Sequence, residues 1–136
     1  MHAQQMIASH PAFTGQHADS LTHCIEACFD CAQACTACAD ACLAEPHVTA
    51  LVACVRLDLD CADICLATGR VLSRQTQSQR ALAWQLLETC AGFCRLCAEE
   101  CEKHAGRHQH CRLCAEACRA CERACHQAMA ASGSRT

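Results

Sequence analysis

Aromatic side chains are scarce in this sequence, whose 136 residues include one tryptophan, three phenylalanines and no tyrosine. No apolar stretch approaches the roughly 20 residues of a membrane-spanning helix, which argues against an integral membrane protein. Lysine and arginine form no long run, and the formal net charge is -3 at pH 7. Nucleic acid or an anionic membrane is therefore not expected as the main partner. A chain of this length suits one domain with one core.

Cysteine, in contrast, is present in large excess, at 18 of the 136 residues. In an exported protein this density would indicate a disulfide scaffold. The first seven residues, MHAQQMI, lack the basic region and apolar run of a signal peptide, so we expect a cytoplasmic protein. Because the cytosol keeps thiols reduced, the same density there predicts metal binding.

The cysteines fall into four blocks, and in three of them the spacing alternates between three and four residues. The second block is sparser, with steps of seven and four. This alternation places every cysteine of a block on one stripe of an α-helix, at the a and d positions of a heptad, whereas a strand would scatter them over both faces. The blocks are Cys24, Cys28, Cys31, Cys35, Cys38 and Cys42; Cys54, Cys61 and Cys65; Cys90, Cys94, Cys97 and Cys101; and Cys111, Cys114, Cys118, Cys121 and Cys125.

Residues that start or end helices flank these blocks. Ser20, before the first block, is suited to cap the first helix. Pro46 is suited to end that helix and Gly106 to end the third. Short connections make neighbouring helices antiparallel. The sequence therefore predicts an all-α fold, an antiparallel up-down-up-down four-helix bundle over residues 20–131, preceded by an N-terminal segment with a short helix (1–19) and followed by a flexible tail (132–136).

Ordinary packing explains this core poorly, because leucine and isoleucine release more free energy than cysteine on burial. Disulfides within one helix are disfavoured, since Cβ atoms three or four residues apart are about 5–6 Å apart and a disulfide needs roughly 3.5–4.5 Å. Disulfides between helices remain an alternative. Thiolates select copper(I), zinc or iron–sulfur clusters. Several zinc ions with four thiolates each would leave a costly buried negative charge, whereas one copper(I) per thiolate leaves the core near neutral.

The pattern resembles that of the cytosolic copper storage proteins over roughly residues 20–130. The resemblance rests on repeats such as CFDCAQAC (28–35) and CRLCAEAC (111–118). The resemblance implies a store of copper(I), with all 18 cysteines as ligands and roughly one ion per cysteine, in a homotetramer of bundles. No nucleophile, base and orienting group stands apart from the cysteines, so we expect no enzyme. A zinc or iron–sulfur binding module and a copper chaperone or sensor remain the alternatives. The copper donor and acceptor are unknown.

Histidines gather near one predicted end of the bundle. The third stripe continues past Cys101 to His104 and His108, and His110 lies just before the fourth block. His47 lies in the turn between the first two helices, which an up-down-up-down bundle places at the same end. Imidazole binds copper well. We therefore predict that His104, His108 and His110 are metal ligands at a mouth through which copper enters, with His47 a weaker candidate.

Two other residues interrupt the cysteine stripes. Asp58 lies between Cys54 and Cys61, where an unpaired buried carboxylate would be costly. It can touch a bound ion, accept a hydrogen bond from a thiol in the empty site, or lie at the edge of the stripe. Met129 extends the last stripe past Cys125 and is interpreted as a filler of the core rather than a ligand.

Overall fold

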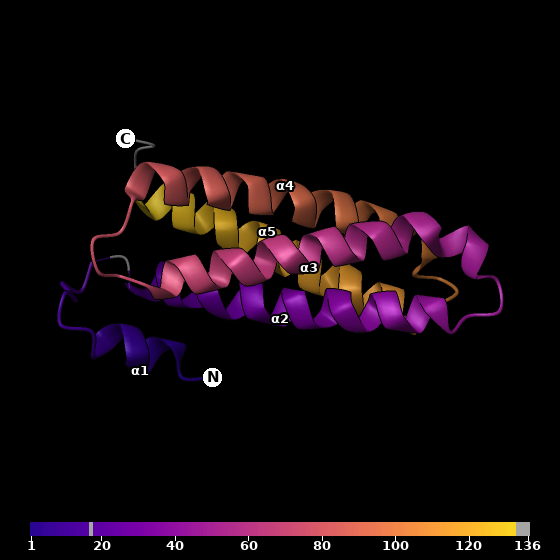
Figure 1. Ribbon diagram of the computed structural model, residues 1–136, viewed down its shortest axis with the longest axis horizontal. Helices are drawn as coiled ribbons and strands as arrows, with labels where there is room; N and C mark the ends of the chain where they lie inside the picture. The colour runs from indigo at the N-terminus through magenta and orange to yellow at the C-terminus, as the bar shows by residue number, and fades with distance from the viewer. Residues whose placement is uncertain (17, 133–136) are drawn as a thin grey trace.

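Four long antiparallel helices make up most of the protein (Figure 1). The structure is a computed structural model and describes residues 1–16 and 18–132. These residues form helices and no strand, which confirms the predicted all-α four-helix bundle. The elements are α1 (Ala3–Ala8), α2 (Ala18–Leu43), the short 3-10 helix η1 (Val48–Leu51), α3 (Val52–Ser73), α4 (Arg80–His104) and α5 (Gln109–Ser132).

The helices close a ring around a single core, because each packs on the next along the chain and α5 packs on α2. The turns between α2 and α3 and between α4 and α5 lie at the same end, on the right of Figure 1. We call this the histidine end, since His104, His108 and His110 lie there. The opposite end, here the far end, carries α1, the connection from α3 to α4 and the last residues of α5.

Helix boundaries differ from the sequence prediction at three places. Helix α2 begins at Ala18, so Ser20 lies inside its first turn and does not cap it as predicted; helix starts are commonly misplaced by one or two residues. Pro46 follows α2 as predicted, but η1 precedes the second long helix. The last helix includes Ser132, which was assigned to the tail, and the rest of that predicted tail, residues 133–136, lies outside the described residues.

Buried aliphatic side chains lie at the far end of the core. Ile7 of α1, Ile25, Leu72 and Leu87 are all buried. They do not fill this end completely, because Leu72 and Leu87 also line a pocket of about 780 Å³. Among the described residues, no helix is both long and apolar enough to cross a membrane.

A glycine lies at a close contact of α2 and α3. A Cβ atom built on Gly69 would meet the ring of Phe29 at 3.0 Å. Such a contact is tighter than usual, so a side chain at this position would require the Phe29 ring to shift by a few tenths of an ångström.

Candidate metal centre

All eighteen cysteines predicted as ligands lie in the core. Each is at most 1% exposed, and all are free thiols. The 3-4 spacing explains this placement, because it keeps each cysteine of a helix on the face that the other three helices cover. The structure thus brings the whole predicted set together, and no disulfide scaffold forms among them.

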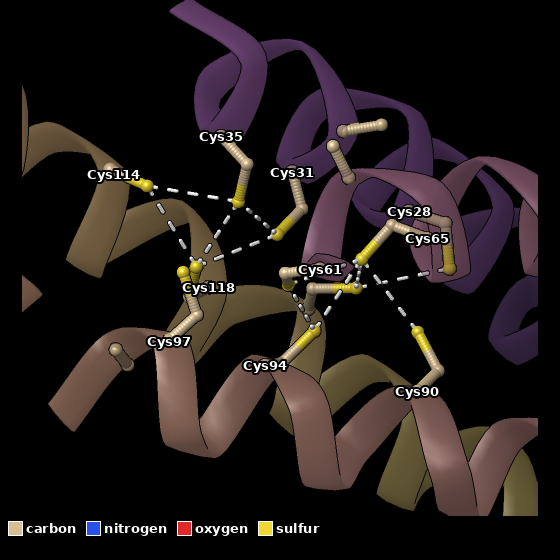
Figure 2. Packing of buried hydrophobic residues seen from close by; sticks show 14 of the residues in the cluster. Cys28, Cys31, Cys35, Cys61, Cys65, Cys90, Cys94, Cys97, Cys114 and Cys118 are labelled. Carbon is tan, nitrogen blue, oxygen red and sulfur yellow. Dashed lines mark hydrogen bonds between the residues drawn. The ribbon is translucent and has the colours of Figure 1, made fainter. Parts of the chain in front are cut away.

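Sulfur atoms on neighbouring helices approach one another closely. The Sγ atoms of Cys54 on α3 and Cys101 on α4 are 3.5 Å apart. Those of Cys35 on α2 and Cys118 on α5 are 3.6 Å apart. Figure 2 shows Cys31, Cys35, Cys114 and Cys118 pointing toward one another from α2 and α5. One ion can therefore contact thiolates of more than one helix.

Diagonally opposite helices also contribute sulfurs to the same place. The Sγ atoms of Cys65 on α3 and Cys121 on α5 are 3.9 Å apart, although these two helices are not neighbours in the ring. Such an approach across the centre requires small side chains, because leucine at the same positions would fill the space with carbon. The cysteine stripe therefore forms one continuous column of sulfur.

The column divides into overlapping groups of four sulfurs, in each of which all ligand atoms lie within 4.8 Å of one another. Four of the five groups named below share members, since Cys31, Cys35, Cys118 and Cys121 each belong to two of them, whereas the group at the histidine end shares none with these four. Shared thiolates can bridge two ions. Five of the groups are Cys28, Cys90, Cys121 and Cys125; Cys31, Cys65, Cys94 and Cys121; Cys31, Cys35, Cys61 and Cys118; Cys35, Cys97, Cys114 and Cys118; and Cys38, Cys42, Cys54 and Cys111.

Burial favours the neutral thiol at the histidine end of the column. It raises the pKa of Cys111 to about 11 and also raises the pKa of Cys42 above its usual range. These two thiols are therefore protonated near neutral pH. Because a thiolate is the metal ligand, an entering ion must displace a proton from each thiol that it binds.

The three predicted histidines lie at the histidine end in different surroundings. Among the described residues, only His110 of these three has thiols within hydrogen-bond reach: its Nδ1 lies 3.5 Å from Sγ of Cys38 and 3.6 Å from Sγ of Cys111. His104 contacts Glu100 instead, at 3.1 Å. His108 stacks on His110, with ring centroids 5.4 Å apart. The weaker candidate, His47, is exposed in the turn before η1.

Glu45 belongs to this end of the site, and sequence reasoning missed it. Its Oε2 atom lies 3.1 Å from Nε2 of His110 and also contacts Nδ1 of His108. Hydrogen bonding by His110 lowers the pKa of this carboxyl. In the sequence, Glu45 stands out only as the residue before Pro46. The available signal was a carboxylate in a turn that shares its end of the bundle with two histidines.

Asp58 lies fully inside the sulfur column. Its Oδ1 atom accepts hydrogen bonds from the thiols of Cys97 at 3.1 Å, Cys114 at 3.2 Å and Cys101 at 3.5 Å, and Oδ2 lies 3.8 Å from Sγ of Cys54. The structure thus agrees with one of the three roles considered for this residue, a thiol-bonded carboxyl in the empty site. Burial raises the pKa of Asp58 to about 8.

Comparisons with known proteins agree with this geometry. The profile of the copper storage protein family, Csp, matches residues 17–130. A comparison with the curated proteins finds no match.

Solved structures of copper storage proteins are similar to the chain. Ccsp of Streptomyces lividans, loaded with 10 copper equivalents, is 50% identical, with a TM-score of 0.92 over 94% of this chain and 98% of that one. A cytosolic copper storage protein of the same organism, with five coppers, is 54% identical, with a TM-score of 0.81 over 82% of this chain and 93% of that one. Cu(I)-bound BsCsp3 is 42% identical, with a TM-score of 0.68 over 76% and 92%. The chain therefore belongs to the copper storage protein family, because it matches the family profile, is about half identical to solved members and has a column of buried thiols.

Proposed function

We propose that this protein stores many copper(I) ions in the cytosol, bound by the cysteine thiolates of its core. The overlapping groups of four sulfurs carry this proposal. A single divalent ion needs one closed group, whereas shared sulfurs suit a cluster of monovalent ions that neutralise the thiolates one by one. The relatives are described as copper-loaded and, in one case, as cytosolic. Membership of the family agrees with storage rather than catalysis.

The proposed ligands are the eighteen cysteines together with the three histidines of the histidine end. His110 is the best-placed imidazole, because its Nδ1 already faces two thiols. His104 and His108 contact carboxylates rather than thiols, with about a fifth of each side chain exposed, and suit ions in transit. Asp58 is not proposed as a ligand, since a carboxylate is a hard donor and copper(I) a soft ion. We propose residues 20–131 as the storage domain.

Anaerobic titration of the reduced protein with copper(I) should reach roughly one ion per cysteine. The expectation follows from charge balance, because each bound ion replaces one thiol proton. Native mass spectrometry counts the ions, and a coloured chelator that competes for copper(I) tests how tightly they are held. Saturation at only a few equivalents would contradict storage and favour a chaperone or sensor.

We also propose that the bundles assemble as a homotetramer, as the resemblance implies, and that α3 provides one contact between copies. Val52, Leu59 and Leu66 recur every seven residues on α3 and are 44–60% exposed. In an antiparallel pairing of two α3 helices centred on Leu59, Val52 would face Leu66 of the partner subunit. Arg56 would then lie beside Asp63 of the partner subunit, a favourable pair of charges.

Leu59→Lys should therefore lower the mass of the assembly in solution, because it places two like charges at the centre of this contact. Size-exclusion chromatography with light scattering measures the mass of the reduced protein. Leu113→Lys is the matched control, since Leu113 is similarly exposed, at 49%, but lies on α5. If the Leu59 variant keeps the mass of the wild type, α3 is not the contact.

A further inference from the structure

We propose that Glu45 is a positioning residue for copper binding, which holds the ring of His110 with its Nδ1 atom turned toward the thiols. The inference rests on the proposed function, since it takes His110 to be a ligand. It goes further in assigning a role to an acidic residue that itself contacts no thiol among the described residues.

The contacts on the two nitrogens of His110 are of different kinds. Nε2 lies 3.1 Å from the carboxylate of Glu45, and Nδ1 lies within 3.6 Å of the sulfurs of Cys38 and Cys111. A carboxylate only accepts hydrogen bonds, so Nε2 of a neutral ring must carry the proton. The lone pair is then on Nδ1, directed at the sulfurs, where an incoming ion would need it.

The carboxylate itself is held close to the column of thiols. The backbone N–H of Glu45 donates to the carbonyl oxygen of Cys42 at 3.2 Å, which ties the turn to the last residues of α2. Cys42 belongs with Cys38 and Cys111 to one of the groups of four sulfurs. Pro46 restricts the backbone of the turn further. The acceptor for His110 is therefore anchored to the same helix that supplies two of the thiols.

The neighbouring ring reinforces this arrangement. His108 contacts the same carboxylate oxygen and stacks on His110 at an interplanar angle of 25°. The side chains of Glu45, His108 and His110 are each only 23–26% exposed, so solvent screens their interactions less than on an open surface. Without Glu45, the His110 ring can rotate by half a turn, which exchanges Nδ1 for a carbon atom next to the sulfurs.

Nuclear magnetic resonance of the reduced, metal-free protein tests the orientation directly. Long-range correlations between ring protons and ¹⁵N identify which nitrogen carries the proton, at about pH 8.5, above the ordinary pKa of histidine. His110→Asn identifies the signals of this ring. Wild type should show the Nε2–H tautomer alone. Glu45→Ala should show a mixture of both tautomers, and Glu45→Gln, which keeps an acceptor oxygen, should restore Nε2–H.

Copper(I) binding provides the second measurement on the same variants. Glu45→Ala should weaken binding of the ion held near His110 by about tenfold or more, as loss of a partner behind a ligand typically does, with capacity lower by at most about one ion. Glu45→Gln should bind nearly as the wild type. Glu99→Ala is the matched control, because Glu99 is an exposed carboxylate of α4 that pairs with Arg95 rather than with a proposed ligand.

The outcomes separate this inference from the proposed function. If Glu45→Ala keeps a single Nε2–H tautomer and the copper affinity of the wild type, Glu45 only clamps the turn and the inference is wrong. The same holds if Glu99→Ala weakens binding equally. A wild-type protein that takes up only a few ions would contradict storage, whereas the tautomer of His110 would still report on Glu45. Circular dichroism verifies that each variant remains helical.

Discussion

Asp58→Asn should stabilise the metal-free protein, and the gain should grow from about pH 4 to about pH 8. Burial raises the pKa of Asp58 from 3.8 to about 8 in the folded protein. Below pH 4 the carboxyl is protonated in both the folded and the unfolded chain, so it imposes no penalty. Between these values only the unfolded chain ionises, which lowers the free energy of unfolding by about 1.4 kcal/mol per pH unit. Above pH 8 both forms are ionised and the penalty stays constant.

Urea denaturation of the reduced protein under anaerobic conditions measures this effect. The difference in unfolding free energy between Asp58→Asn and wild type should rise to several kcal/mol, on the order of 5 at most, by pH 8. Asparagine keeps an oxygen that accepts the thiol hydrogen bonds of Cys97 and Cys114. Asp60→Asn is the control, because Asp60 lies on the outer face of the same helix in a pair with Arg56. If the unfolding free energies of wild type and Asp58→Asn change with pH in parallel, the pKa of Asp58 is not raised in the folded protein and the prediction is wrong.

Substituting both His104 and His108 by alanine should slow loading and release of copper by about tenfold or more while removing only an ion or so of capacity. Copper(I) binds imidazole, whereas the pocket at the far end is lined by aliphatic side chains such as Leu72 and Leu87, so we expect ions to enter at the histidine end. An uncharged imidazole can bind a soft ion and then release it to the thiols behind it without adding charge to the site. Stopped-flow measurement of copper(I) uptake, and of its removal by a chelator, gives both rates.

A core variant separates rate from capacity. Replacing Cys31 and Cys35 by alanine should lower capacity and leave the initial uptake rate nearly unchanged, because these sulfurs lie in the middle of the column and each belongs to two groups of four. The double histidine variant should show the opposite pattern. Wild-type loading and release rates in that variant would mean that these two histidines are solvated residues or terminal ligands and do not gate the store.

The sequence alone predicted the cysteine-filled bundle because the information is local. A 3-4 alternation fixes which face of a helix a residue occupies, so the placement of all eighteen cysteines in one core followed from their spacing. The copper storage family followed from the same repeats, and its profile confirms it. The prediction that Ser20 caps the first helix was wrong, since a serine signals a helix start only to within a residue or two.

The pairing of side chains across the bundle was decided only by the tertiary structure. Periodicity says nothing of how far one helix is shifted along or rotated against another, and shifts of a few ångströms determine which atoms meet. For that reason, the sequence grouped three histidines together, whereas the structure brings His110 alone among them to the thiols and turns His104 toward Glu100. The same shifts place Glu45, 65 residues away in the chain, behind the ring of His110. They also surround Asp58 with thiols of two other helices, which makes a costly buried carboxyl part of the column.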